Sequence, residues 1–195
     1  MYIVFEGIDT AGKSTQVALL KKKFPDALTT KEPGGTKFGA TIREIVLHSE
    51  NLDHITELLL FLSDRREHYK QVVQPAMDTN TMLISDRSFI SGVAYALCNQ
   101  SLTLEKLLSL NALTLDDRVP DLVVLFNIPK DTLIERLSAK EIDGIEKRGI
   151  EYLLDVQQSL IDVTKHLDLT YLIVDASDSI ETIHQDILDF IKEHQ

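Results

Sequence analysis

Residues 7–14 could bind the phosphate groups of a nucleotide. Gly7, Gly12, Lys13 and Ser14 match the pattern G-x-x-x-x-G-K-[ST] of a phosphate-binding P-loop. The glycines allow backbone N–H groups to curl around phosphate oxygens, and a helix that begins here adds the positive end of its dipole. In such a loop the lysine reaches the β- and γ-phosphates, and the serine hydroxyl binds Mg²⁺. A chance glycine-rich turn is the alternative, but a β-prone run before the motif and helical spacing after it favour the P-loop.

Other residues suited to phosphate chemistry are an acid and several arginines. Asp86 ends a short apolar run, a place where P-loop proteins hold Mg²⁺ directly or through water. A structural pair with the next residue, Arg87, is the alternative. Arg43 and Arg65 fall on expected helices, and their planar guanidinium groups could grip a phosphate, although each taken alone is more often a surface residue. Phe61, close to Arg65, is either part of the core or a stacking surface for a base.

Short β-prone runs alternate with helical stretches along the whole chain. The expected strands are 2–5, 27–30, 81–85, 122–128 and 170–174. The expected helices are 13–24, 38–48, 54–77, 89–115, 130–139, 149–166 and 179–193. This alternation predicts an α/β protein, a three-layer P-loop NTPase fold whose five-stranded parallel sheet is covered by helices on both faces. Ligands bind at the carboxyl ends of such strands, where the P-loop, the loop 32–36 and Asp86 all fall.

The length and the loops suggest how the chain is organised. Its 195 residues predict a single domain over 1–195. Residues 138–149 are rich in charge, contain two glycines and lie between two helices. We expect a small mobile lid there, with an ordinary solvated loop as the alternative.

The composition excludes several classes of protein. The formal net charge of −11 gives no general attraction for nucleic acid or anionic membranes, so anionic ligands must be held by a few local cations. The single cysteine, Cys98, cannot form an intramolecular disulfide and has no zinc-like spacing with the six histidines. No apolar run approaches the length of a membrane span. We expect a cytoplasmic protein with no nucleic-acid or membrane partner.

Several motifs, taken in order, resemble the thymidylate kinases of bacteria. They are 5–9 (FEGID), 11–16 (AGKSTQ), 31–36 (KEPGGT), 60–65 (LFLSDR), 85–88 (SDRS) and 175–177 (DAS). The resemblance covers nearly the whole chain. It implies an enzyme that transfers the γ-phosphoryl group of ATP to dTMP, giving dTDP and ADP for dTTP biosynthesis, with Mg²⁺ as cofactor and a homodimeric assembly. The alternatives are a kinase for another nucleoside monophosphate or a deoxynucleoside, and a nucleotide-dependent switch or binding module.

The resemblance also implies roles for individual residues. Asp9 contacts the dTMP sugar near its 3′-hydroxyl, Phe61 stacks on thymine, and Tyr95 lies near the sugar 2′-carbon. The phosphate of dTMP is held, or the phosphoryl group oriented, by Arg43, Arg65 and Arg87. The expected ATP site comprises Gly7, Ile8, Asp9, Thr10, Ala11, Gly12, Lys13, Ser14, Thr15 and Arg136. The expected metal ligands are Ser14 and Asp86, and the expected catalytic residues are Lys13, Arg87, Asp9 and Lys140.

The chain departs from the family pattern at a few positions. Thr10 stands where many relatives have Arg or Gly, so the P-loop supplies no arginine to the transferred phosphate. We expect that cation to come from the lid, from Lys140, Lys147 or Arg148, with Lys140 as the first choice. Gly92 and Ala96 stand where relatives often have polar side chains, so we expect fewer hydrogen bonds to the base.

Overall fold

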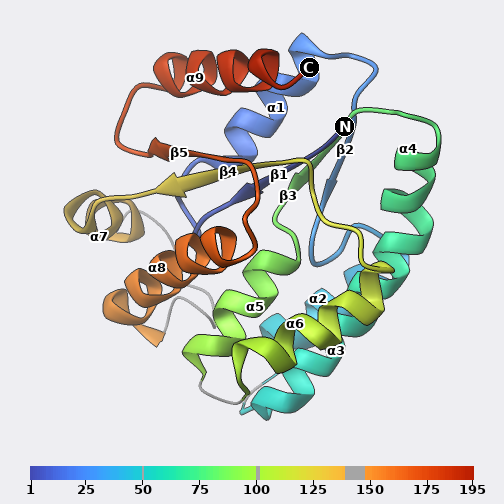
Figure 1. The fold of residues 1–195 in the computed structure, drawn as a ribbon. Helices are drawn as coiled ribbons and strands as arrows, with labels where there is room; N and C mark the ends of the chain where they lie inside the picture. The colour runs from blue at the N-terminus through green and yellow to red at the C-terminus, as the bar shows by residue number, and fades with distance from the viewer. Residues whose placement is uncertain (50, 100–101, 139–147) are drawn as a thin grey trace.

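The computed structural model describes residues 1–49, 51–99, 102–138 and 148–195 (Figure 1). Most of the expected lid, including Lys140 and Lys147, therefore lies outside the described residues.

A parallel sheet of five strands forms the centre of the protein (Figure 1). Its strands are β1 (Tyr2–Glu6), β2 (Leu28–Lys31), β3 (Leu83–Asp86), β4 (Leu122–Asn127) and β5 (Tyr171–Asp175). They pair in the order β2-β3-β1-β4-β5, and every pairing is parallel. All five predicted strands are confirmed, with ends that differ by one or two residues. The continuous apolar runs of β1, β3 and β4 are buried because helices cover the sheet on both faces.

Helices form the two outer layers. They are α1 (Lys13–Lys23), α2 (Lys37–His48), α3 (His54–His68), α4 (Gln74–Asp78), α5 (Phe89–Cys98), α6 (Leu104–Leu115), α7 (Lys130–Ser138), α8 (Ile150–His166) and α9 (Ile180–Glu193). Figure 1 shows α1 and α9 on one face of the sheet and α5, α6 and α8 on the other. The predicted three-layer fold is confirmed. None of the described helices has the length and apolar character needed to cross a membrane.

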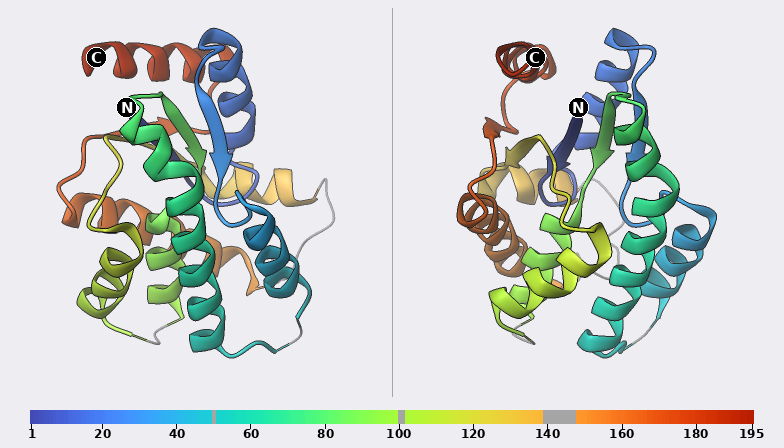
Figure 2. Two further views of the ribbon diagram at one scale, coloured as in Figure 1. Left: turned by 90° about the vertical axis from the view of Figure 1, so that its right-hand side faces the viewer. Right: turned by 45° about the vertical axis from the view of Figure 1, so that its right-hand side comes forward.

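The predicted helix 54–77 is continuous but contains a π-helical turn. It consists of α3, a π-helical segment over Tyr69–Val73 and α4, and Figure 2 shows the three as one long rod. Pro75 at the start of α4 has no N–H, and its ring would clash with the carbonyl of residue 71 in a regular α-helix. The wider π turn accommodates the proline without ending the helix.

The prediction of one long helix over 89–115 is wrong. The chain forms two helices, α5 and α6, and the Thr103 hydroxyl caps the second by accepting a hydrogen bond from the Lys106 N–H. A threonine at this position satisfies an N–H that has no partner inside the helix, which favours a new start. Because of the break, α6 packs against both α3 and α5.

The register of the sheet gathers the expected chemistry at one edge. Phe5 on β1 pairs with Asp86 on β3, and Lys31 on β2 pairs with the same residue. The P-loop after β1, the loop 32–36 after β2 and Asp86 therefore start at one level, at the carboxyl ends of three neighbouring strands.

Candidate active site

The P-loop joins β1 to α1 and ends in a backbone conformation that suits glycine. Gly12 caps α1 with φ at 98°, and a Cβ atom there would meet no described atom within 4 Å. The backbone angle, and not crowding, explains the glycine, because side chains disfavour this left-handed region. Gly12 directly precedes the first N–H groups of α1, which are where a phosphate binds in a P-loop.

Lys13 is folded back onto the loop. Its side chain is buried, and Nζ donates hydrogen bonds of 2.9 Å to the carbonyls of Gly7 and Ile8. Burial, and then the positive charge of Arg87, lower the pKa of Lys13 to about 8. The ammonium group is therefore held next to the phosphate-binding space. Anionic phosphate oxygens bound there would stabilise its charged form, which burial and Arg87 disfavour.

Ser14 and Asp86 form a pair of oxygen ligands although they are far apart in the sequence. The Ser14 hydroxyl donates a 2.7 Å hydrogen bond to Oδ2 of Asp86. A hydroxyl and a carboxylate at the P-loop are oxygen donors of the kind that Mg²⁺ prefers. These two residues fit the expected metal site.

A second cleft lies beside the P-loop, between α2, α3 and α5. Its lining includes all six residues expected to bind the acceptor, Asp9, Arg43, Phe61, Arg65, Arg87 and Tyr95. The neighbouring cleft over the P-loop contains Lys13, Ser14 and Asp86. Both clefts are lined by Asp9, Glu32, Arg43 and Arg87, so the two spaces meet at these side chains.

Arg87 is fixed at the boundary between the two clefts. It donates 2.8 Å and 3.0 Å hydrogen bonds to Asp9 Oδ1 and Ser91 Oγ, and its guanidinium carbon lies 5.7 Å from the centre of the Tyr95 ring. The arginine is mostly buried, and Asp9 is only partly exposed. A planar cation held in this way is oriented before any anion arrives.

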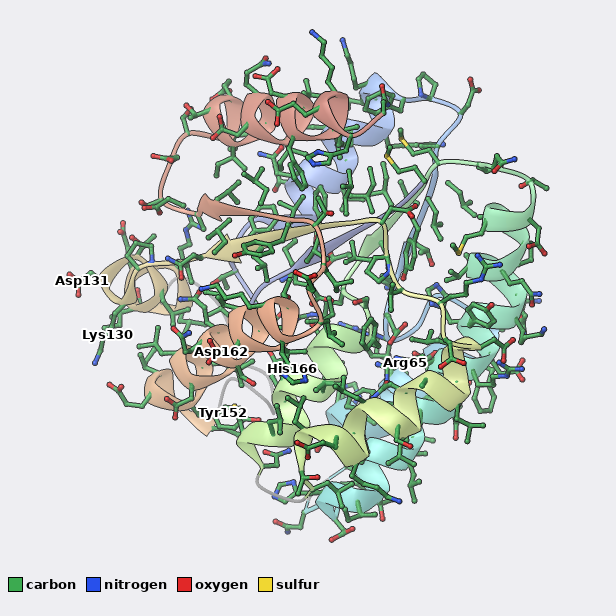
Figure 3. All side chains as sticks on the ribbon, viewed as in Figure 1. Arg65, Lys130, Asp131, Tyr152, Asp162 and His166 are labelled. Atoms are coloured by element: carbon green, nitrogen blue, oxygen red, sulfur yellow. The ribbon has the colours of Figure 1, made fainter. Side chains whose placement is uncertain are left out.

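Arg65, labelled in Figure 3, is buried in a polar network. Its Nε and Nη2 atoms pair with Oε1 of Glu32, and Nη1 donates a 2.6 Å hydrogen bond to Oδ1 of Asn111. A Cβ atom at Gly92 would lie 2.7 Å from Nη2, so the absence of a side chain there makes room for the guanidinium. His68 Nδ1 lies 3.4 Å from the other oxygen of Glu32.

This network was missed at the sequence level. The pairing partners are 33 and 46 residues from Arg65 in the sequence. The glutamate stands in the 31–36 motif, which was a usable signal, whereas nothing local marks Asn111 on α6. Each of the three nitrogens of the Arg65 guanidinium bonds to Glu32 or Asn111, and each Nη atom keeps a second N–H group.

Arg136 connects the P-loop with the loop that follows β5. Nη1 donates a 2.9 Å hydrogen bond to the Thr10 carbonyl, and Nη2 a 2.6 Å hydrogen bond to the Ala176 carbonyl. Arg136, a residue of the expected ATP site, therefore fixes the backbone of the P-loop against the loop that follows β5.

Arg148, one of the three expected lid cations, is occupied elsewhere. It donates hydrogen bonds to Glu57 on α3 (3.0 Å), to Asn99 after α5 (3.2 Å) and to the hydroxyl of Tyr152 on α8 (3.0 Å). These contacts join α3, the end of α5 and α8.

The fold and the site define a P-loop phosphotransferase with a separate cleft for a small anionic acceptor. A family model described as thymidylate kinase matches residues 5–187. The chain is 50% identical to the thymidylate kinase of Sulfurovum sp. (strain NBC37-1) over 192 residues, which are 98% of this chain and 100% of the relative. It is 47% identical to the thymidylate kinase of Sulfurimonas denitrificans, with coverage of 98% of this chain and 99% of the relative. It is similar to the crystal structure of thymidylate kinase from Ehrlichia chaffeensis, with a TM-score of 0.80, 25% identity and 98% coverage of both chains.

The chain belongs to the thymidylate kinase family. The expected family and the expected kinase class are thereby confirmed, and the alternatives, a switch or binding module among them, are not favoured.

Proposed function

We propose that this protein transfers the γ-phosphoryl group of ATP to dTMP, giving dTDP and ADP for dTTP biosynthesis. Family membership supports the reaction. The observation that carries the proposal is the junction of the two clefts at Asp9, Arg43 and Arg87. An acceptor phosphate held by these arginines would lie against the end of a triphosphate bound at the P-loop, as direct phosphoryl transfer requires.

The donor side of the site would be formed by the P-loop. Residues 7–15 would surround the phosphates of ATP, with Lys13 turning from the loop carbonyls to the β- and γ-phosphates. Ser14 and Asp86 would hold Mg²⁺, which neutralises charge on the phosphates when it is bound. Arg136, already fixed to the carbonyls of Thr10 and Ala176, would lie beside the adenine.

The acceptor side would be divided between phosphate, sugar and base. We propose that Arg43 and Arg87 hold the dTMP phosphate and that Asp9, oriented by Arg87, receives the 3′-hydroxyl. Phe61 would stack on thymine and Tyr95 would pack near the sugar 2′-carbon.

Arg65 has a different role in this proposal from the phosphate contact expected from the sequence. Its charge is matched by Glu32 and each of its nitrogens already bonds to Glu32 or Asn111, so it attracts a doubly charged phosphate less strongly than an unpaired arginine would. We propose that it forms a fixed polar wall of the base pocket. Since Gly92 and Ala96 offer no side-chain hydrogen bonds, this wall matters for the selection of the base.

We also propose a homodimer. Apolar side chains on three adjacent helices are exposed, Ile45 on α2, Leu59 on α3 and Leu113 on α6. Because α3 packs against both other helices, these residues belong to one layer that a second copy could cover.

Two further expectations remain part of the proposal. We propose one domain over 1–195 with a lid at 138–149, in which Lys140 supplies the cation for the transferred phosphate, since Arg148 is bound to Glu57. A cytoplasmic location follows from the proposed reaction, because ATP and nucleoside monophosphates are cytoplasmic metabolites.

A coupled assay of ADP release tests the acceptor. Purified protein with Mg²⁺ and ATP is given dTMP, dUMP, dCMP, dGMP, dAMP or thymidine in turn. We expect dTMP to give the highest kcat/KM and the reaction without acceptor to be negligible. Equal or faster turnover with another acceptor would reassign the substrate, and rapid ADP release without any acceptor would favour a switch. Arg87→Ala is expected to reduce dTMP turnover, whereas the exposed Lys22→Ala serves as the matched control.

A further inference from the structure

Thr10 has a strained backbone in the middle of the P-loop. Its φ is 66°, in the left-handed region. A β-branched residue is a clear outlier there, whereas glycine adopts this conformation without penalty. The same loop uses glycine at position 12, where φ is also positive. The threonine side chain therefore stands at a position where a residue without a side chain would be more stable.

The hydroxyl of Thr10 is a second unfavourable feature of the same residue. Oγ1 is buried and has no hydrogen-bond partner among the described residues. Buried hydroxyl groups are nearly always hydrogen-bonded, because losing water without gaining a partner is costly. Neither the core nor a neighbouring loop within the described chain gives the hydroxyl a structural task.

The position of Thr10 points to a ligand. The residue is partly exposed and lines the cleft that also contains Lys13, Ser14 and Asp86. It follows Asp9 directly, and Asp9 lines both clefts. Thr10 therefore lies on the donor side of the boundary where the donor and acceptor clefts meet.

The surrounding residues hold Thr10 in its strained conformation. Its carbonyl accepts a 2.9 Å hydrogen bond from Arg136, which is itself bound to the Ala176 carbonyl. The preceding residue, Asp9, is paired with Arg87. Strained residues persist where their surroundings fix them on both sides, and they concentrate at ligand-binding sites.

We propose that the Thr10 hydroxyl contacts the substrate and donates a hydrogen bond to an oxygen of the phosphoryl group as it is transferred. This inference rests on the proposed kinase reaction. For this contact to form, the side chain rotates about its Cα–Cβ bond to a staggered position in which the hydroxyl, buried in the free protein, faces the cleft that Thr10 lines. Phosphate oxygens are acceptors only, so they supply the partner that the free protein lacks. A fixed donor at a group whose charge is shifting in the transition state contributes to kcat more than to substrate affinity.

Three variants separate the hydroxyl from the backbone. Thr10→Ser keeps the hydroxyl, Thr10→Val keeps the branched shape and removes it, and Thr10→Gly removes both the hydroxyl and the strain. We expect Thr10→Ser to retain kcat within about threefold, and Thr10→Val and Thr10→Gly to lose about tenfold to a hundredfold. KM for ATP and for dTMP should change less than about threefold in all of them. Thr10→Gly should also have a higher Tm than the wild type, because the strain is relieved.

If Thr10 had only a structural role, Thr10→Gly would not combine a higher Tm with a lower kcat. Assays are run well below the lowest Tm, and circular dichroism confirms that each variant is folded. Wild-type kcat in Thr10→Val and Thr10→Gly would overturn the proposal, and so would an equal loss in all three variants. Calorimetry with Mg²⁺-ADP adds a second measurement, since a contact to the transferred group predicts unchanged ADP affinity in Thr10→Val.

The acceptor panel with the wild-type protein distinguishes a failure of the proposed reaction from a failure of the Thr10 proposal. If the wild-type protein does not phosphorylate dTMP, the reaction is reassigned from the acceptor panel, and the Thr10 variants are compared with the acceptor that the panel identifies. The Thr10 proposal fails only when an active wild type and its hydroxyl-free variants turn over at the same rate, or when all three variants lose activity equally.

Discussion

The Nη1 atom of Arg65 lies 2.6 Å from the amide oxygen of Asn111, so a residue of α6 fixes an arginine of α3 that lines the acceptor cleft. The other end of the amide is fixed as well, because its Nδ2 donates a 2.7 Å hydrogen bond to the Leu107 carbonyl. The amide can therefore present only its oxygen to the guanidinium. The position of α6, set by the break before Thr103, thus controls the orientation of Arg65.

Asn111→Leu should weaken acceptor binding and spare ATP binding. The substitution leaves a buried guanidinium nitrogen without its partner, which commonly costs about 1.5–3 kcal/mol of folding stability, and Arg65 loses the contact that fixes its orientation in the acceptor cleft. We expect KM for dTMP to rise about tenfold with KM for ATP unchanged in steady-state kinetics. The exposed Ser109→Ala on the same helix is the control, and an equal rise in both KM values would contradict the assignment.

Lys13→Ala should remove most of the phosphoryl transfer without unfolding the protein. Loss of a fixed charge contact to a transition state commonly costs about 2.7–4 kcal/mol, a hundredfold to thousandfold in rate. Within the described part of the chain, the lysine ammonium group bonds to two carbonyls of its own loop, so Tm should change little. Lys22→Ala, at an exposed position of α1, is the matched control. Near-normal turnover of folded Lys13→Ala would refute the role of the P-loop lysine.

The pH dependence of ATP capture should report Lys13. Burial and Arg87 lower its pKa to about 8, so the side chain is charged below that pH and becomes neutral above it. Because the charged form attracts phosphates, kcat/KM for ATP should fall as the pH rises through about 8. Bound phosphates favour the ammonium form, so kcat at saturating ATP should fall only at higher pH. Profiles between about pH 6 and 10 measure both constants. A kcat/KM that stays level up to about pH 9.5 would be inconsistent with this pKa.

Part of the site could be predicted because its signals are local. Gly12, Lys13 and Ser14 are neighbours in the sequence, and apolar runs mark the strands that precede Asp9 and Arg87. The register of parallel strands then brings Asp86 beside Ser14.

The remaining features depend on contacts between distant elements. The partners of Arg65 and the partners of Arg148 come from other elements of the fold, and no spacing within a helix encodes them. The break at Thr103 was missed because the apolar residues on both sides fit one helical period, and a single capping hydroxyl decides the outcome.

Asp64 should make the stability depend on pH. Burial, and then the charge of Glu32, raise the pKa of this carboxyl to about 6, and its Oδ2 has no hydrogen-bond partner among the described residues. The folded state therefore binds the proton more tightly than the unfolded state. The resulting stabilisation is fully present below about pH 4 and is lost as the pH rises through about 6.

Asp64→Asn should remove this dependence. The amide keeps an oxygen for the Gly34 N–H and carries no charge at any pH. We expect the free energy of unfolding of the wild type, relative to Asp64→Asn, to fall between about pH 4 and pH 8 in urea titrations. Asp26→Asn, at an exposed position, is the control. A constant difference between wild type and Asp64→Asn across this range would show that the carboxyl is not perturbed.

Arg148 and Lys140 should behave differently when each is replaced by alanine. Arg148 neutralises the nearly buried Glu57 and ties α8 to α3, so Arg148→Ala leaves a carboxylate unpaired beside the acceptor cleft and should lower Tm. Because Lys140 is the proposed cation of the lid, Lys140→Ala should lower kcat at saturating ATP and dTMP without changing Tm. A double-mutant cycle of Arg148→Ala with Glu57→Gln measures the pair, and we expect a coupling of about 1–3 kcal/mol. If Arg148→Ala keeps its Tm and loses kcat, Arg148 and not Lys140 is the cation that acts on the transferred phosphate.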